Sequence, residues 1–246
     1  MAVVAIGSVH GAPGVTTLAL ALAAAWPRAA LVIEADPDGG TVAARTAMPV
    51  VPGLTELAAR ARGEVSASDI DACSQPLPAG GRAVVAAPGA DATGAALRSA
   101  TPALLPHLRT LADTDVLADV GRLRPGSPAL GLVEGADLLV VVVRPTTAEV
   151  AVLAHRLAVL QGAPDLVVVC GPGGEHTASE VADVLGIDVL ASLPHDVRSV
   201  SSLEWGAPRA HRNLLVRAAV SLAAGLAERV RPDGAPWWSS PTEVPA

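Results

Sequence analysis

The sequence predicts an α/β fold: a doubly wound, mostly parallel sheet with helices on both faces. Strand-length apolar runs alternate with helix-length stretches along most of the 246 residues, which is the order of elements that builds a parallel sheet through right-handed crossovers. Most of these runs are continuously apolar, as is typical of strands covered on both faces. A glycine-containing turn between the first predicted strand and the first predicted helix is the third indication.

The elements follow in order along the chain. The first strand is the aliphatic run at residues 3–6, and the first helix follows the glycine turn at residues 16–25. Further aliphatic runs predict strands at residues 29–33, 83–87, 116–118, 138–143, 166–169 and 189–190. Stretches of helix length between them predict helices at residues 54–61, 93–111, 148–160, 179–185 and 209–230. Pro102 and Pro106 predict a break or kink in the 93–111 helix, because an interior proline removes a helical hydrogen bond.

The chain reads as one domain with a tail. No interior linker or internal repeat divides residues 1–231, whereas residues 232–246 are rich in Pro and Ser and predict a flexible tail. Trp237 and Trp238 lie in this tail. Exposed tryptophans often anchor a partner, so we keep a partner or membrane-interface contact there as a hypothesis.

Composition narrows the class of protein. Half of the residues (51%) are apolar and the net charge is −7, which argues against nucleic acid as a partner because such binding needs clustered basic residues. Cys73 and Cys170 follow no metal or redox spacing, so we expect two buried free thiols. The N-terminus lacks the basic segment of a signal peptide, and the longest aliphatic run, residues 138–143, is far shorter than the roughly 18 residues of a membrane span. We expect a cytoplasmic protein.

The glycine turn has the setting of a phosphate-binding loop. Residues 7–17 read GSVHGAPGVTT. Gly11 and Gly14 let the backbone turn tightly and present N–H groups to an anion, and the helix N-terminus adds partial positive charge. Thr16 has the position and the hydroxyl to hold Mg²⁺. Val15 stands where the lysine of such loops reaches the phosphates, and all seventeen basic residues of the chain are arginines. The loop alone is equally consistent with a turn that binds no ligand.

Acidic residues follow two further strands. Glu34 and Asp36, in the segment EADPD at residues 34–38, come just after the second strand, at the edge where open α/β sheets bind ligands. A plain chain reversal is the alternative. Asp119 ends the strand at residues 116–118; in P-loop proteins such an acid holds magnesium opposite the loop hydroxyl. An ordinary strand-terminating aspartate is the alternative, but the three motifs in this order are more specific than any one of them.

In this order the motifs resemble those of the MinD/ParA family, the deviant Walker A group of the SIMIBI P-loop proteins. Residues 10–17 resemble the family's Lys-Gly-Gly-x-Gly-Lys-Ser/Thr-Thr loop, residues 34–38 its Asp-x-Asp-Pro-Gln motif, and residues 119–121 its Walker B end. Pro145-Thr146, Leu193-Pro194-His195-Asp196 and Gly206-Ala207-Pro208 resemble later segments of the family. The resemblance covers roughly residues 2–230.

The resemblance implies a P-loop NTPase fold and a nucleotide site. The implied nucleotide-binding residues are His10, Gly11, Ala12, Pro13, Gly14, Val15, Thr16, Thr17 and Pro194. Thr16 and Asp119 are the implied magnesium ligands. Asp36 matches the carboxylate that orients the attacking water, and Glu34, in the same motif, is the second catalytic candidate.

At several positions this sequence departs from the family's motifs, and these differences affect the chemistry expected of the site. His10 replaces the lysine that reaches the partner's phosphates across a nucleotide-sandwich dimer, and Val15 replaces the lysine that contacts phosphate within the subunit. The nucleobase-reading asparagine falls near Cys170 and Gly171. We therefore expect ATP/ADP and Mg²⁺ to bind weakly or not at all, with little stabilisation of a developing phosphoryl charge.

Arginines offer a replacement charge. Arg122 and Arg124 follow the Walker B strand and Arg144 follows the next strand, so all three belong near one sheet edge. A guanidinium binds phosphate bidentately. The favoured alternative is that they are exposed loop arginines.

Three functional hypotheses remain open. The first is a weak or inactive ATPase, most similar to the CpaE/TadZ-like members, that forms a homodimer and binds protein partners in positioning or assembly of a pilus, secretion or division machinery. The second is a nucleotide-free pseudo-ATPase scaffold, and the third an active ATPase in chromosome or plasmid partitioning. The 209–230 helix carries an apolar face that we expect to dock on the core; peripheral membrane contact through the C-terminal region is the alternative.

Overall fold

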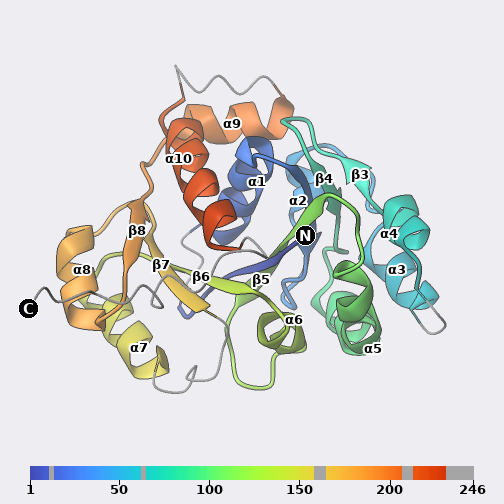
Figure 1. Ribbon diagram of the computed structural model, residues 1–246, viewed down its shortest axis with the longest axis horizontal. Helices are drawn as coiled ribbons and strands as arrows, with labels where there is room; N and C mark the ends of the chain where they lie inside the picture. The colour runs from blue at the N-terminus through green and yellow to red at the C-terminus, as the bar shows by residue number, and fades with distance from the viewer. Residues whose placement is uncertain (11–13, 62–64, 158–164, 207–212, 231–246) are drawn as a thin grey trace, which may run out of the picture.

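A parallel sheet forms the centre of the molecule (Figure 1). The computed structural model describes residues 1–10, 14–61, 65–157, 165–206 and 213–230. The strands are β1 (Val3–Ser8), β2 (Ala29–Glu34), β3 (Gln75–Pro76), β4 (Arg82–Val84), β5 (Thr114–Arg122), β6 (Leu138–Val143), β7 (Asp165–Cys170) and β8 (Val189–Ser192). Their order in the sheet is β3-β4-β2-β5-β1-β6-β7-β8. All neighbours are parallel except β3 and β4, which confirms the predicted fold class.

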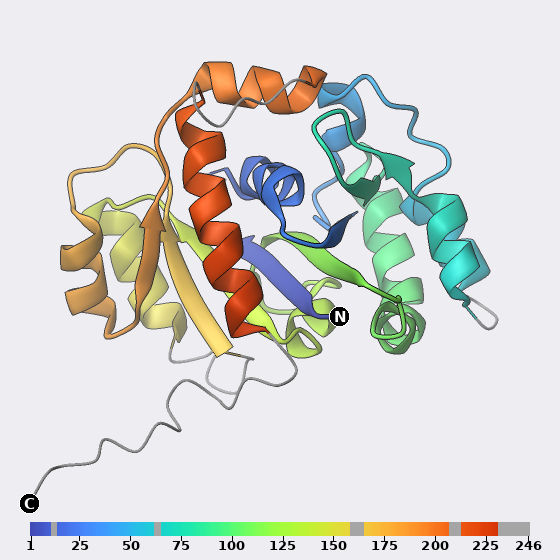
Figure 2. The same ribbon diagram turned by 45° about the horizontal axis from the view of Figure 1, so that its top comes forward.

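Helices cover both faces of the sheet (Figures 1 and 2). One layer holds α3 (Leu54–Arg60), α4 (Ala67–Cys73), α5 (Ala90–Leu108), α6 (Leu130–Glu134), α7 (Thr147–Leu157) and α8 (Ala178–Leu185). The other holds α1 (Val15–Ala25), α2 (Val42–Arg45), α9 (Val197–Trp205) and α10 (Leu214–Arg229). In β1, Val3 and Ala5 face the first layer while Val4 and Ile6 face the second. Because both faces are buried, the central strands are mostly apolar.

Two expectations about helices have clear outcomes. A break or kink was predicted at Pro102 and Pro106; helix α5 continues through both prolines, so a break is wrong. Its buried face, which includes Leu97 and Leu104, stabilises the helix by packing that offsets the missing backbone hydrogen bonds. Helix α10 packs against α1 in the core, as expected. Within the described ranges, no helix is both long enough and apolar enough to cross a membrane.

A buried carboxylate fastens the amino-terminal end of the sheet. Asp115 at the start of β5 is 1% exposed. Its Oδ1 accepts a hydrogen bond from the Ala2 N–H (2.8 Å), and its Oδ2 accepts one from Trp26 Nε1 (2.7 Å). Arg28 forms an ion pair with the same oxygen at 2.6 Å. The carboxylate therefore links β1, the end of α1 and β5.

Some predicted features lie outside the described residues, namely Gly11, Ala12, Pro13 and the tail at 232–246 with Trp237 and Trp238. Cys73 and Cys170 are buried and free, as expected.

Candidate functional site

The candidate site lies at the carboxyl ends of β1, β2 and β5 in the middle of the sheet. Helix α1 begins directly after Gly14, whose φ of 102° lies in the left-handed region that favours glycine. The Gly14 carbonyl accepts the first helical hydrogen bond, from the Leu18 N–H at 2.8 Å. This geometry aims the N-terminus of an eleven-residue helix at the sheet edge, where unpaired N–H groups favour an anion.

Asp119 is the buried acid of the site. It lies beside Ile6 of β1 and Glu34 of β2 in the sheet and is 0% exposed. Its Oδ1 accepts a hydrogen bond from the Gly121 N–H at 3.1 Å. The Thr16 hydroxyl lies close enough to favour the charged carboxylate, yet among the described residues none gives Oδ2 a hydrogen bond of good geometry. Burial raises the pKa of Asp119 to about 7.

The Asp119 carboxylate and the Thr16 hydroxyl together suit a small hard cation. Buried polar atoms normally have a partner, so an unpaired oxygen on a buried carboxylate with a hydroxyl nearby favours a ligand at this position. Magnesium uses one or two carboxylates together with waters and phosphate oxygens.

Asp36 is held next to the end of β5. Gly121 has a φ of 59°, and a Cβ at this position would overlap the Asp36 carboxyl group. Only glycine therefore lets the Asp36 side chain pack against this turn. The Asp36 Oδ1 accepts a hydrogen bond from the Asp38 N–H at 2.9 Å, and burial raises the Asp36 pKa.

Glu34 is engaged by backbone on both oxygens. Its Oε1 accepts hydrogen bonds from the N–H groups of Thr41 (2.6 Å) and Val42 (2.9 Å), and its Oε2 accepts one from Ala86 (2.8 Å). Burial nevertheless raises the Glu34 pKa. These bonds tie the end of β2 to the start of α2 and to the segment after β4. The geometry favours a positioning role for Glu34 over direct action on a substrate.

Two pockets adjoin at the start of α1. We call the first, of about 280 Å³, the polar pocket. It is lined by Ser8, Gly14, Val15, Thr16, Thr17, Glu34, Asp36, Asp38, Gly39, Thr41, Arg45, Gly121 and Arg122. We call the second, of about 230 Å³, the apolar pocket. It is lined by Gly14, Thr17, Leu18, Arg144, Pro172, Leu193, Pro194, His195, Asp196, Val197, Val200 and Leu215. Gly14 and Thr17 line both.

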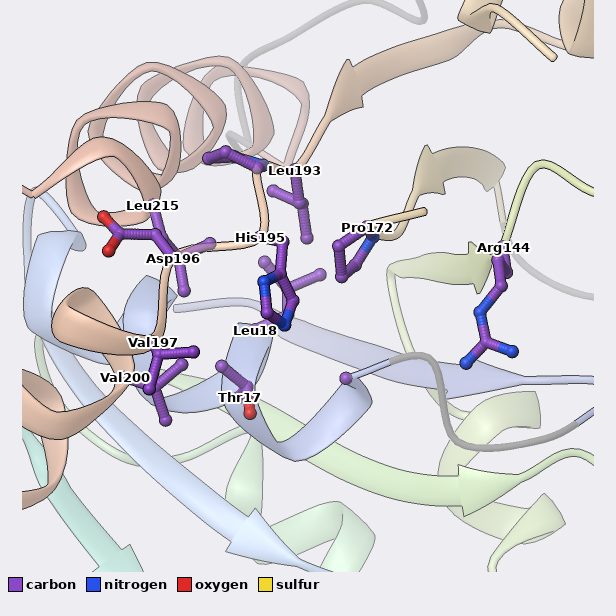
Figure 3. A pocket seen from close by; sticks show the side chains of 12 residues that line it. Thr17, Leu18, Arg144, Pro172, Leu193, His195, Asp196, Val197, Val200 and Leu215 are labelled. Atoms are coloured by element: carbon purple, nitrogen blue, oxygen red, sulfur yellow. The ribbon is translucent and has the colours of Figure 1, made fainter. Parts of the chain in front are cut away.

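Figure 3 shows the apolar pocket, with His195 directed into it between Pro172 and Thr17. Pro194 contributes to its wall, where the sequence placed a nucleotide contact. The Asp196 carboxylate is occupied: its Oδ1 accepts from the Ser199 N–H (3.1 Å) and its Oδ2 from the Leu214 N–H (2.8 Å). Asp196 thus caps α9 and fixes the start of α10.

The other predicted nucleotide-binding residues that the structure describes fall into two groups. Thr16, Thr17, Gly14 and Val15 line the polar pocket, but Val15 is 5% exposed and brings no charge. His10, the last residue that the structure describes before Gly14, is exposed and does not line either of these two pockets.

The three candidate arginines also separate. Arg122 lines the polar pocket, while Arg124 is exposed and pairs with Asp38. Arg144 lies at the apolar pocket and pairs with Glu149 at 3.4 Å.

Sequence reasoning missed Arg45. This residue ends the four-residue helix α2. Its Nη2 donates a hydrogen bond to Thr17 Oγ1 (3.0 Å), and its Nε donates one to Glu204 Oε1 on α9 (2.7 Å). No motif marks this arginine, because its neighbours are distant in sequence and come together only in the fold.

Comparison with known proteins identifies the fold. No protein-family model matches the chain, and no curated protein matches it in sequence. Solved structures do match. A ParA family ATPase from Chlorobium tepidum TLS superposes with a TM-score of 0.76 at 14% identity, over 92% of this chain and 98% of that one. The septum site-determining protein MinD from Pyrococcus horikoshii OT3, complexed with Mg-ADP, gives 0.74 at 16% identity, over 92% and 95%.

A third match is a chain of the MinC:MinD cell division protein complex of Aquifex aeolicus, with a TM-score of 0.69 at 16% identity over 96% of this chain and 99% of that one. At such identities the comparison establishes the fold. The chain has the fold of the MinD and ParA ATPases, as the order of its motifs predicts.

Proposed function

We propose that this protein is a degenerate member of the MinD/ParA family that binds Mg²⁺ with ADP or ATP across the polar and apolar pockets and hydrolyses ATP slowly or not at all. The observation that carries the proposal is the unpaired Oδ2 of the buried Asp119, next to Thr16 at the N-terminus of α1. A fold that needed no ligand would gain stability by pairing or removing this atom.

The residues present fit a magnesium nucleotide. Thr16 and Asp119 would hold the cation, and the amide groups at the start of α1 would hold phosphate. The walls formed by Pro194 and His195 suit the flat apolar faces of a base. Bound magnesium would neutralise phosphate charge, and Asp36 would orient water beside it.

The missing lysines limit the chemistry. In P-loop proteins, a lysine stabilises charge that develops on the transferred phosphoryl group, and a buried valine at position 15 cannot do so. Losing one such contact commonly lowers the rate about 100- to 1,000-fold. The proposal therefore separates binding, which the site supports, from turnover, which it supports poorly.

The proposed biological role is positioning or assembly of a pilus, secretion or division machinery, through a homodimer and protein partners. The MinC:MinD complex of Aquifex aeolicus supports a partner-binding role for this fold, and a CpaE/TadZ-like function is the finer form of the proposal. A cytoplasmic location and peripheral membrane contact through the C-terminal region belong to the same proposal.

Two other functions make different predictions. A nucleotide-free scaffold needs no free oxygen on Asp119 and would bind neither ADP nor ATP. A partitioning ATPase would turn over ATP at a rate that depends on Asp36.

Titration calorimetry with Mg-ADP and Mg-ATP, repeated in EDTA, tests the proposal. We expect saturable, magnesium-dependent binding and little turnover in a phosphate-release assay. Asp71→Ala is the control for Asp36→Ala, since Asp71 pairs with Arg82 at the surface, away from both pockets. Absence of binding would favour the scaffold, and turnover lost in Asp36→Ala but kept in Asp71→Ala would favour the active ATPase; either result contradicts the proposal.

A further inference from the structure

We propose that Arg45 is a phosphate-binding residue of the polar pocket, supplying from α2 the positive charge that the loop lacks, and that Glu204 on α9 competes with phosphate for it. This inference rests on the proposed function, because it assigns a residue to the phosphate chain of the same ligand.

The placement of Arg45 is the first argument. Its hydrogen bond to Thr17 Oγ1 sets the guanidinium against the first turn of α1. Thr17 is one of two residues that line both pockets. Arg45 therefore stands where the pocket that suits phosphates meets the pocket that suits a base. It is a fixed charge, because bonds from both α1 and α9 hold it.

The donors of Arg45 are the second argument. A guanidinium carries five N–H groups, and those to Thr17 and Glu204 use two of them. The remaining donors lie in the same plane and suit the bidentate recognition of phosphate oxygens. Arg45 and Arg122 are the basic side chains among the described residues that line this pocket.

The charge of the pocket is the third argument. Its lining includes the carboxylates of Glu34, Asp36 and Asp38, which repel a bare phosphate. An anion in this pocket therefore needs both a bound cation and an arginine to offset these charges. This arrangement predicts that pyrophosphate binds with Mg²⁺ and fails to bind in EDTA.

The ion pair with Glu204 determines how available Arg45 is to a phosphate. The two side chains form an ion pair at 2.7 Å and are 23% and 19% exposed, so each is only partly screened by water. Phosphate that binds Arg45 shares it with the Glu204 carboxylate. Removing the charge of Glu204 therefore frees Arg45 for the ligand, whereas removing Arg45 deprives the ligand of its contact.

The test compares Mg-ADP and Mg-pyrophosphate binding by calorimetry in matched variants. Arg45→Ala is expected to weaken both ligands about 10- to 100-fold, the range for a charge-assisted hydrogen bond, and Arg45→Lys to recover part of the loss. Glu204→Gln is expected to bind both about 2- to 5-fold more tightly. Arg60→Ala, which breaks the surface pair with Asp69, is expected to change neither. Thermal unfolding of each variant reports its folded state.

The outcomes separate this inference from the proposed function. If Arg45→Ala binds Mg-ADP and Mg-pyrophosphate with the affinity of the wild type, the inference about Arg45 is overturned and the proposed function stands. Equal weakening in Arg45→Ala and Glu204→Gln also overturns it, because a mere brace between α2 and α9 would give that result. Arg45-dependent binding of Mg-pyrophosphate without binding of nucleotide overturns the proposed function and leaves the inference standing. Absence of binding of either ligand to the wild type overturns both.

Discussion

Replacing Asp119 by asparagine is expected to stabilise the protein without ligand and to remove its affinity for a magnesium nucleotide. The carboxyl group is fully buried, and its pKa is about 7 against an ordinary value of 3.8. A raised pKa means that the folded state holds the proton more tightly, so the folded state loses stability as the pH rises from about 4 to about 7. Above that range the penalty is constant.

The magnitude follows from the shift. At roughly 1.4 kcal/mol per pKa unit, the buried charge costs up to about 4 kcal/mol at pH 8 and about 2 kcal/mol at pH 5. Asparagine keeps the acceptor for the Gly121 N–H and carries no charge. Asp119→Asn is therefore expected to raise the free energy of unfolding at pH 8 by about 2 kcal/mol more than at pH 5.

Urea unfolding at the two pH values measures this difference. Asp115→Asn is the matched control, since Asp115 is equally buried but both of its oxygens accept hydrogen bonds; it is expected to destabilise the protein. If Asp119→Asn also destabilises the protein at pH 8, or stabilises it equally at both pH values, the reasoning about an uncompensated buried charge is refuted.

Three further predictions concern stability and affinity. Asp115→Ala leaves buried donors without acceptors and is expected to cost about 3–5 kcal/mol in urea unfolding, against less than about 0.5 kcal/mol for the exposed Asp71→Ala; equal costs would contradict the role of Asp115. Val15→Lys is expected to tighten Mg-ADP binding about 10-fold in calorimetry by adding a charge-assisted hydrogen bond, and unchanged affinity would count against phosphate in the polar pocket. Gly121→Ala is expected to destabilise the protein by about 2 kcal/mol, part of which Asp36→Ala restores in the double variant, because the added Cβ overlaps that carboxyl group; purely additive costs would show that the strain is in the backbone alone.

The sequence was most informative where the chain is apolar on both faces. The runs in β1, β2, β5 and β6 predicted the centre of the sheet, because strands buried from two sides are mostly apolar. Strand β3 has two residues and escaped prediction. Helix α9 buries only Ser199 and Leu203, too few positions to produce a visible period.

The residues of the candidate site likewise include some that the sequence predicts and some that it does not. Thr16 and Asp36 were predictable because they stand at a helix start and just after a strand, which topology places at one edge. Asp119 was found by its motif, but it does not end its strand as predicted: β5 continues to Arg122. Arg45 was not predictable, because its contacts to Thr17 and Glu204 span 28 and 159 residues and depend on how α2 meets α1 and α9. The positioning geometry of Glu34 likewise depends on the later segment at Ala86.

The most direct test of the magnesium–nucleotide site is a crystal structure with ADP and Mn²⁺, which replaces Mg²⁺ and gives an anomalous signal. We predict one manganese peak between Thr16 and Asp119, with the nucleotide spanning the polar and apolar pockets. A nucleotide bound elsewhere, or crystals whose pockets hold neither manganese nor ADP at saturating concentrations, would contradict the account.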